Sequence, residues 1–426
     1  MKKRVVITGM GVAAPNAHGL DNYEQALRAG LSGIRFIPKL QELNFGCQIA
    51  GIPENFEEIR RRYFDREKLM SINDNIGFAS VSAVDAWKDA GFNLLDDGDD
   101  NVDWDTGVIA GSGIGGMDTI ATMVVPQIND GKVRRMGSRI VEQVMGSGTS
   151  ARISGLIGAG NQVTSNSSAC STGNEAVIEA MWRIRMGLAK RMVAGGSEGA
   201  SPYIWGGFDA MRVICRKFND NPAAGSRPMS ASAAGFVPGS GAAMLVLEDL
   251  ETALARGARI YAEIIGGYVN CGGQRMGGSM TAPNPEGVRR CIRAAIADAG
   301  ISPAEIDAIN GHLTATYADP HEVKSWAAAL GRTPDNFPYI QATKSLVGHC
   351  LGAAGAIECV ASILELYKGF LHPSINCEDI HPEIAEYAPK IPQKCMDFPD
   401  LKIIAKAGFG FGDVNSCIIF KKWEGK

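Results

Sequence analysis

Cys170 is the residue whose surroundings best suit covalent chemistry. It lies in "SSACSTGNEAVIEA" (167–180), between small residues and just before a run with the pattern of a helix. At a helix N-terminus, unpaired amides and the helix dipole favour a thiolate, and the amide of the cysteine itself can donate to an oxyanion. Most cysteines are small buried hydrophobes, so we expect the other nine to pack in the interior.

His312, Lys344 and His349 are the partners that we expect for this thiol. They occur in "NGHLTAT" and "TKSLVGHCLG", in loops that follow predicted strands of the second half of the chain. Ligands of α/β sheets meet the loops at the carboxyl ends of the strands, which brings these residues near Cys170. A lone histidine is more often a surface or core residue than a catalyst, and we interpret the remaining four in this way: His18, His321, His372 and His381.

The elements that must position these residues occur as an internal repeat in the chain. Three pairs of segments resemble each other: 82–92 and 291–301, 162–187 and 338–369, and 235–249 and 408–420. Internal repeats of this kind indicate a duplicated architecture. The alternation of strand and helix patterns predicts βαβ units with mostly parallel sheets, in two halves that meet near 250–258.

Composition limits the class of protein. The 426 residues exceed one common core, and the net charge of −4 is spread without basic tracts, which argues against nucleic acid and membrane partners. The ten cysteines form no CxxC pair, so neither a disulfide framework nor a zinc ribbon is expected. The start "MKKRVVITGMGVAAP" reads as a strand rather than a signal peptide, and no run reaches the ~18 apolar residues of a membrane span. We expect a cytoplasmic protein.

Several motifs together are similar to one family. "SACSTG", "NGHLTAT", "TKSLVGHCLGAAGAIE" and "GFGFGDVN" resemble the β-ketoacyl-acyl-carrier-protein synthases of types I and II, condensing enzymes of the thiolase fold. The likeness extends from "VVITGMGV" near the start to "SCIIF" near the end. It implies an α/β fold of duplicated βαβαβαββ halves in a layered α-β-α-β-α sandwich, with the nucleophile in residues 1–254 and the histidines in 255–426.

The resemblance implies a role for each reactive residue. Cys170 would take the acyl chain from a phosphopantetheine thioester, and His312 and His349 would stabilise the enolate formed when malonyl-carrier loses carbon dioxide. Lys344 and Glu358 would orient the histidines rather than transfer the key proton; an ordinary buried ion pair is the alternative. The net reaction is a decarboxylating Claisen condensation that gives 3-oxoacyl-acyl-carrier protein for fatty acid, polyene or polyketide-like biosynthesis. It requires no metal or redox cofactor.

The walls of the substrate channel follow from the same resemblance. Thr314 and Thr316 match threonines that hydrogen-bond the pantetheine arm, and Thr281 in "MTAP" lines the same channel. Phe411 in "GFGFG" matches a gate between acyl pocket and active site, and its amide would join that of Cys170 at the oxyanion. Ordinary turn chemistry is the structural alternative for these residues.

An acyl carrier protein is the implied partner. Carriers are acidic, so basic residues around the channel mouth would steer them. The family's dock aligns with Arg66, Lys68, Arg134, Arg135, Arg216 and Lys217. Scattered surface charge is the alternative for any one of them. The family also implies a homodimer through the central sheets, although a heterodimer with a related subunit stays open.

Departures from the family pattern leave the substrate open. Leu313 stands where the family usually has glycine, and a positive φ there would be strained for leucine. Asp413 and Val414 replace a glycine and a threonine, which predicts a stiffer gate loop with an added charge. The segment "SRPMSASAAGFVPGSG" lacks the usual acidic and basic cluster. Acyl length, saturation, type and pathway are therefore not fixed by the sequence.

Three other functions are compatible with parts of the pattern. A thiolase needs a second cysteine in the final glycine loop, where "GFGFGDVN" has none, and Cys350 lies in a different loop. A non-catalytic partner similar to chain-length factors would replace the nucleophile, which Cys170 argues against. A cysteine hydrolase would resolve the acyl-enzyme with water, and the duplication with two histidines in the second half disfavours it.

Overall fold

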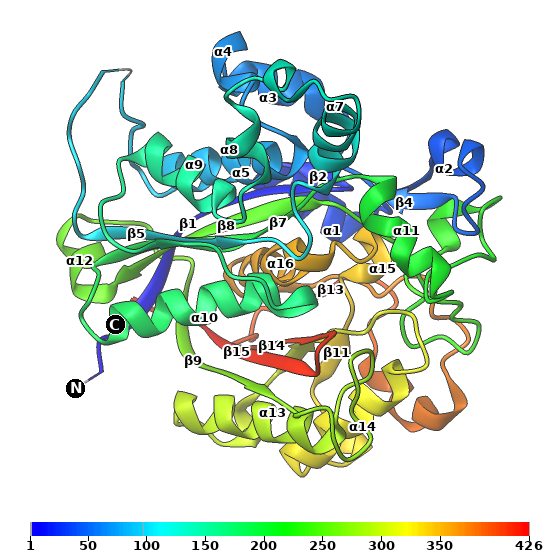
Figure 1. Ribbon diagram of the computed structural model, residues 1–426. Helices are drawn as coiled ribbons and strands as arrows, with labels where there is room; N and C mark the ends of the chain where they lie inside the picture. Colours follow the sequence, from blue (N-terminus) through cyan, green and yellow to red (C-terminus); the bar gives the residue numbers. More distant parts are fainter. Residues whose placement is uncertain (1, 97, 426) are drawn as a thin grey trace.

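The computed structural model describes residues 2–96 and 98–425, and it arranges them in five layers (Figure 1). Two layers of strands are separated by two inner helices, and further helices cover each outer face. The inner helices are α10 (Thr172–Arg185) and α16 (Ala354–Lys368); the outer ones are α5 (Asp74–Asp89) and α9 (Gly148–Ile157) on one face and α13 (Pro285–Ala299) and α14 (Asp319–Leu330) on the other. The predicted layered sandwich is confirmed.

The strands of both layers form one hydrogen-bonded path. Its order is β11 (Tyr339–Gln341), β10 (Ala308–Asn310), β14 (Ile403–Gly410), β15 (Val414–Lys422), β9 (Ala262–Cys271), β1 (Val5–Ala14), β8 (Gly241–Asp249), β7 (Arg191–Glu198), β5 (Thr106–Gly111) and β6 (Val163–Thr164), with β2 (Ala17–His18) beside β1. The layers are joined where β1 pairs with β9 in the register Val5 to Ile264.

The prediction of mostly parallel sheets is wrong. Only β5 pairs in parallel with β6 and β7, and β10 with β11 and β14, among the described strands. The pairs β1–β8, β7–β8, β14–β15 and β9–β15 are antiparallel. In each half the last strand, β8 or β15, returns antiparallel beside its predecessor: β15 follows β14 through a tight turn, and β8 follows β7 through a segment that contains α11.

Shorter elements complete the molecule. They are α1 (Leu20–Ala29), β3 (Ile34–Phe36), α2 (Pro38–Glu42), β4 (Ile49–Gly51), α3 (Phe56–Tyr63), α4 (Arg66–Leu69), α6 (Met117–Thr119), α7 (Val125–Asn129), α8 (Ile140–Val144), α11 (Pro202–Ala210), α12 (Leu250–Ala255), α15 (Lys344–Val347), β12 (Phe370–Leu371) and β13 (Met396–Asp397). Single turns η3 (Ala169–Ser171) and η7 (Leu351–Ala353) precede the two inner helices. No helix among the described residues combines the length and apolar character needed to cross a bilayer.

The two inner helices approach each other closely at their N-terminal ends. A Cβ built on Gly173 would lie 2.6 Å from the amide nitrogen of Ala356, and one on Gly355 would lie 2.6 Å from that of Asn174. Glycine at both positions is therefore required for this contact. The contact brings the turn that carries Cys170 against the loop that carries His349.

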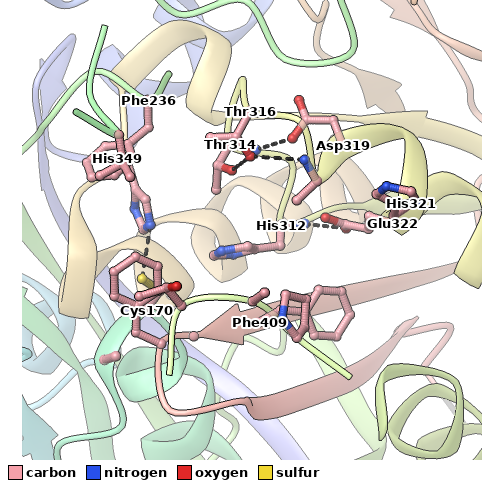
Figure 2. Close-up of a pocket in the computed structure, with 18 of the residues that line it drawn as sticks. Cys170, Phe236, His312, Thr314, Thr316, Asp319, His321, Glu322, His349 and Phe409 are labelled. Carbon is pink, nitrogen blue, oxygen red and sulfur yellow. Dashed lines mark hydrogen bonds between the residues drawn. The ribbon is translucent and has the colours of Figure 1, made fainter. Parts of the chain in front are cut away.

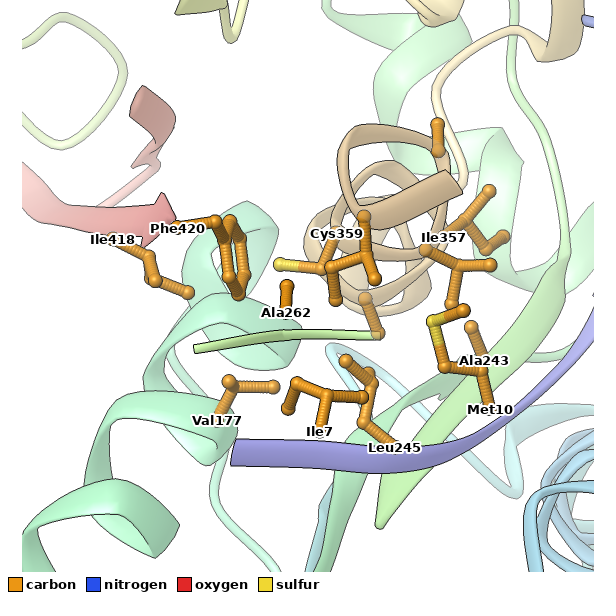
Figure 3. Close-up of a cluster of buried hydrophobic side chains, with 14 of the residues drawn as sticks. Ile7, Met10, Val177, Ala243, Leu245, Ala262, Ile357, Cys359, Ile418 and Phe420 are labelled. Carbon is orange, nitrogen blue, oxygen red and sulfur yellow. The ribbon is translucent and has the colours of Figure 1, made fainter. Parts of the chain in front are cut away.

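The core between the layers is built from both halves of the chain (Figure 3). Ile7 and Leu245 come from the first half and Ile418 and Phe420 from the second, and all are fully buried in one cluster that also contains Ile357 and Cys359 of α16. A helix that is apolar on all sides is typical of such a central position, and α16 is buried over nearly its whole length. The rigid interior fixes the ends of the strands and helices that carry the site.

Candidate active site

Cys170 lies in the turn η3 immediately before α10, as predicted, at the wall of a cavity of about 530 Å³. The preceding residue, Ala169, has a positive φ of 48°, a strained conformation that aims the turn at the cavity. The sulfur lies 3.0 Å from Nε2 of His349, and Figure 2 shows the imidazole pointing at it. The sulfur of Cys170 and a ring nitrogen of each of His312 and His349 lie within 4.8 Å of one another.

The backbone fixes which nitrogen of His349 carries the proton. The amide of Leu351 donates to Nδ1 over 3.2 Å, so Nδ1 is an acceptor and the proton of the neutral ring is on Nε2. The N–H that points at the sulfur of Cys170 is therefore a hydrogen-bond donor rather than a base. Burial and the charge of Lys344 hold the pKa of His349 well below its usual value, which keeps the ring neutral.

His312 is held in the same state by different groups. Lys344 Nζ lies 3.5 Å from Nδ1, so the ammonium occupies the acceptor nitrogen and leaves Nε2–H for the cavity. The backbone amide of His312 donates to the buried carboxylate of Glu322 over 2.7 Å. Burial, with the charge of Lys344, holds the pKa of His312 well below its usual value. The rings of His312 and His349 lie 5.4 Å apart, edge to face.

The resting thiol differs from the prediction that the helix N-terminus favours a thiolate. Burial raises the pKa of Cys170 to about 11, and the charge of Lys344 and the backbone N–H of Phe411 offset only part of this rise. Burial of the sulfur is thus the largest influence on this pKa. At neutral pH the site holds a protonated thiol with a small thiolate fraction.

Lys344 and Glu358 form a buried ion pair, which was the alternative to an orienting role, while Lys344 also contacts His312; the orienting role itself stays a prediction. A third member was not predicted: Lys406 of β14, fully buried, lies 2.7 Å from the second carboxylate oxygen of Glu358. The signal that could have found it is a lone lysine in the otherwise apolar strand "IIAKAGFG".

The turn between β14 and β15 carries Phe411 to the sulfur of Cys170. A Cβ on Gly410 would lie 2.9 Å from the carbonyl oxygen of Ser168 and 3.1 Å from the amide nitrogen of Cys170, so only glycine allows this approach. The ring of Phe411 faces that of Phe208 on α11 at 6.1 Å.

The predicted channel residues line the same cavity. Thr281, Thr314, Thr316 and Phe411 all contribute to its wall, and the hydroxyls of Thr314 and Thr316 lie 3.0 Å apart. Further lining residues were not predicted: Ile114, Phe208, Val213, Phe236 and Leu351 make one part apolar, and Asp319, His321 and Glu322 lie at the other (Figure 2). The interpretation of His321 as an ordinary surface residue is thus incomplete, because it is exposed at the rim of this cavity.

Two family models together match most of the chain. Residues 2–253 match the β-ketoacyl synthase N-terminal domain and residues 261–378 match the β-ketoacyl synthase C-terminal domain. The chain belongs to the β-ketoacyl synthase family.

Known proteins agree with this placement over the full length of the synthase. It is 36% identical to the chloroplastic 3-oxoacyl-[acyl-carrier-protein] synthase I of Arabidopsis thaliana, covering 99% of this chain and 87% of the relative. A β-ketoacyl synthase from Burkholderia phymatum STM815 has 31% identity and a TM-score of 0.89, with 99% and 100% of the two chains covered. A type II PKS ketosynthase solved in complex with its acyl-carrier protein has 27% identity and a TM-score of 0.87, again covering 99% and 100%.

The family resemblance and the enzyme class predicted from the sequence are therefore confirmed: this β-ketoacyl synthase is an acyltransferase. The thiolase and chain-length-factor alternatives are not favoured. No cysteine occupies the glycine loop 408–413, and Cys350 contacts the carbonyl of Val347 instead. Of the cysteines expected in the interior, Cys271 is exposed and Cys395 is half-buried, and the rest are buried as predicted.

The departures from the β-ketoacyl synthase pattern have structural explanations. Leu313 does adopt a positive φ, of 25°, and it is buried with its amide held by Glu322 at 2.8 Å. Asp413 adds no surface charge, because it is buried and accepts hydrogen bonds from the amides of Gln274 at 2.9 Å and Asn284 at 2.8 Å. It thereby ties the Phe411 turn to the loop 272–284.

The basic residues proposed for carrier docking do not form one cluster in the chain. Arg216 bonds to Asp209 at the end of α11, the helix whose Phe208 lines the cavity, and Lys217 follows it. Arg66 and Lys68 lie on α4, which Figure 1 places beyond the outer face of α5. Arg134 and Arg135 lie in the turn after α7, on the same outer side. Only the pair at 216–217 therefore adjoins an element of the cavity wall.

Proposed function

We propose that this β-ketoacyl synthase condenses an acyl chain held on Cys170 with malonyl-acyl-carrier protein and releases 3-oxoacyl-acyl-carrier protein. The observation that carries the proposal is the placement of two neutral imidazoles beside one thiol: Nε2–H of His312 is left for the cavity, and Nε2–H of His349 points at the sulfur of Cys170. A hydrolase would need a base to activate water, whereas both imidazoles here are set as donors.

The first half-reaction acylates the cysteine. The sulfur of Cys170 attacks the thioester carbonyl, the new carbon–sulfur bond replaces the one to the carrier's pantetheine, and the proton of the thiol leaves with the carrier thiol. The oxyanion that forms lies beside the amides of Cys170 and Phe411. Leaving and attacking groups are both thiols, so the exchange is close to balanced.

The second half-reaction makes the new carbon–carbon bond. The malonyl carboxylate leaves as carbon dioxide, and its bonding electrons become an enolate whose oxygen accepts hydrogen bonds from His312 and His349. The α-carbon then attacks the acyl carbonyl, and the sulfur of Cys170 leaves and regains a proton. Electrons balance without an oxidant or reductant, so no redox cofactor enters these steps; that the reaction needs no metal stays a prediction. Lys344 and Glu358 hold His312 in its donor form.

The remaining parts of the proposal concern the partners and location. Thr314 and Thr316 would hydrogen-bond the pantetheine arm, with Thr281 beside them. An acidic carrier would dock by Arg216 and Lys217, and by Arg66, Lys68, Arg134 and Arg135 if a second subunit brings them to the channel mouth. A homodimer would do so. The free state of all ten cysteines supports a reducing compartment such as the cytoplasm.

Intact mass spectrometry tests the reaction. The wild type and Cys170→Ala are incubated with acyl-carrier substrates of graded length and then with malonyl-carrier. We expect only the wild type to gain the acyl mass and then to release a product two carbons longer, and the preferred length identifies the acyl pocket's substrate. Failure of the wild type to acylate with any chain would mean that Cys170 only packs.

A further inference from the structure

Lys406 carries a charge into the centre of the molecule that the reaction above does not use. It lies in the middle of β14, between β10 and β15, and its side chain is 0% exposed. The adjoining residues Ala405 and Ala407 are small and apolar. An ammonium group is costly to remove from water and is rarely found there without a partner and a purpose.

The partner of Lys406 is already occupied. Glu358 faces Lys406 with Oε2 at 2.7 Å, while Oε1 accepts from Lys344. One carboxylate therefore lies between two ammonium groups, and the cluster Lys344, Glu358 and Lys406 has a surplus of one positive charge. Lys344 extends it to the active site through its contact with Nδ1 of His312 at 3.5 Å.

Other titratable groups surround the cluster and the two imidazoles. They are Cys170, Glu198 and Glu322 at the site and Tyr23, Cys350, Cys359 and Cys417 behind it. Glu198 is bound by Ser112 and by several backbone amides, and Glu322 by the amides of His312 and Leu313. Those two carboxylates are hydrogen-bonded by neutral groups, whereas Glu358 is in direct ion-pair contact with Lys344.

We propose that Lys406 is a positioning residue that balances Glu358, so that Lys344 presents an uncompensated positive charge to His312 and to the anions formed at Cys170. The thiolate, the enolate and the tetrahedral oxyanion are all negative, and each is stabilised by such a surplus. The inference rests on the proposed function for its meaning in catalysis, but the surplus charge exists without it.

The charges of the cluster act on its neighbours in the direction that the proposal requires. The charge of Lys406 adds to that of Lys344 in lowering the pKa of both His312 and His349. At Cys170, Lys344 lowers the pKa of the thiol and Glu358 raises it. Removal of Lys406 would leave Lys344 and Glu358 as a neutral pair and would take the surplus away.

The test changes the net charge of the cluster while keeping the shape of the substituted side chains similar. Lys406→Met keeps an unbranched side chain and brings the cluster from +1 to zero, and Lys406→Met with Glu358→Gln returns it to +1 while leaving an oxygen for Lys344. The readout is the rate at which iodoacetamide alkylates Cys170, followed on its peptide by mass spectrometry from pH 6 to 10. Lys402→Met, the same substitution at an exposed site before β14, is the control.

We expect Lys406→Met to alkylate about tenfold more slowly than wild type below the thiol pKa, because a lost unit charge shifts that pKa upward by about one unit. The double variant should return to within about threefold of wild type, and Lys402→Met should match it. An unchanged rate in Lys406→Met overturns the proposal. So does a double variant as slow as the single one, because Lys406 would then act through packing.

A second variant covers the case in which Lys406→Met does not fold. Glu358→Gln alone raises the cluster to +2 and should speed alkylation, and an unchanged or slower rate contradicts the proposal. Alkylation uses no carrier substrate, so its result stands apart from condensation. If wild type shows the charge dependence but never condenses, the proposed function fails and this inference stands. If wild type condenses, Lys406→Met should lose more activity at pH 6 than at pH 8. Removal of the Lys406 charge raises the pKa of both imidazoles, so a larger fraction of the variant carries protonated rings at the lower pH.

Discussion

At the scale of single residues, burial sets the protonation of nearly every group around the site. Cys170 keeps its proton because it is desolvated, while His312 and His349 lose theirs for the same reason. What distinguishes their roles is the donor behind each ring, Lys344 for one and the amide of Leu351 for the other. A histidine's neighbour therefore decides whether it gives or accepts a hydrogen bond.

Glu365 of α16 extends this logic to stability. Burial raises the pKa of its carboxyl to about 8, whereas an unfolded glutamate titrates near about 4.3. Between these values the native state binds more protons than the unfolded state, so stability falls as pH rises from about 4.3 to 8. Glu365→Gln removes that titration and keeps an acceptor for the amide of His372.

We therefore expect Glu365→Gln to melt at nearly the wild-type temperature at pH 5 and several degrees above wild type at pH 8.5. Thermal unfolding followed by circular dichroism across this range measures the difference. The exposed Glu386→Gln should leave the wild-type profile unchanged. A constant offset between Glu365→Gln and wild type at all pH values would show that Glu365 does not titrate in this window.

At the scale of elements, the turn that carries Phe411 is bonded to a second loop. The Phe411 turn is joined to the loop 272–284 by both carboxylate bonds of Asp413, and by the backbone bonds Gly412 to Met280 at 2.8 Å and Gly272 to Asp413 at 2.9 Å. These bonds tie the position of each loop to that of the other. Thr281 and Phe411, which line the cavity from these two loops, are coupled by this contact.

Asp413→Gly tests the coupling. Glycine accepts the positive φ of 63° at this position, so the substitution removes the bonds without backbone strain. We expect the free energy of unfolding to fall by about 2 kcal/mol and amide exchange to quicken across 272–284. Asp400→Gly, at an exposed site before β14, is the matched control. Unchanged protection of 272–284 would mean that the backbone bonds alone hold the loops.

The elements also show which parts of the fold and the site could be predicted from the sequence. The paired segments predicted the duplication and placed the thiol opposite the histidines, because local patterns and motifs carry that information, whereas the layers were implied by the family resemblance. Strand direction was mispredicted, since it depends on which distant strand is the neighbour. Lys406 and Asp413 could not be placed either, because a buried charge is recognised only by a partner such as Glu358, far away in the sequence.

At the scale of the whole molecule, the chain exposes apolar side chains on one face. They lie on and around α7 and α8: Met123, Val125, Ile128, Val133, Val141 and Met145. Patches of this kind mark association surfaces, which supports the proposed homodimer, although this patch lies on helices and the family resemblance implies an interface through the central sheets. The division of the chain into two halves, between residues 254 and 255, stays a prediction.

Light scattering after size exclusion tests the assembly. We expect a mass twice that of the 426-residue chain, and partial or complete conversion to monomer in Ile128→Lys with Val141→Lys. Leu254→Lys, an exposed apolar position on α12 far from α7 in Figure 1, is the control and should stay dimeric. A dimer that survives both lysines would place the interface elsewhere.

The position of β1 in the middle of the strand path has a consequence for synthesis. Its residues 5–13 pair with 242–249, and residues 5–7 also pair with 262–264, so β1 waits for partners that are synthesised more than two hundred residues later. At about 5–20 residues per second this delay is on the order of tens of seconds. Gly9 and Gly11, which let α5 approach to within contact of the strand, also weaken its pairing with wrong edges during the wait.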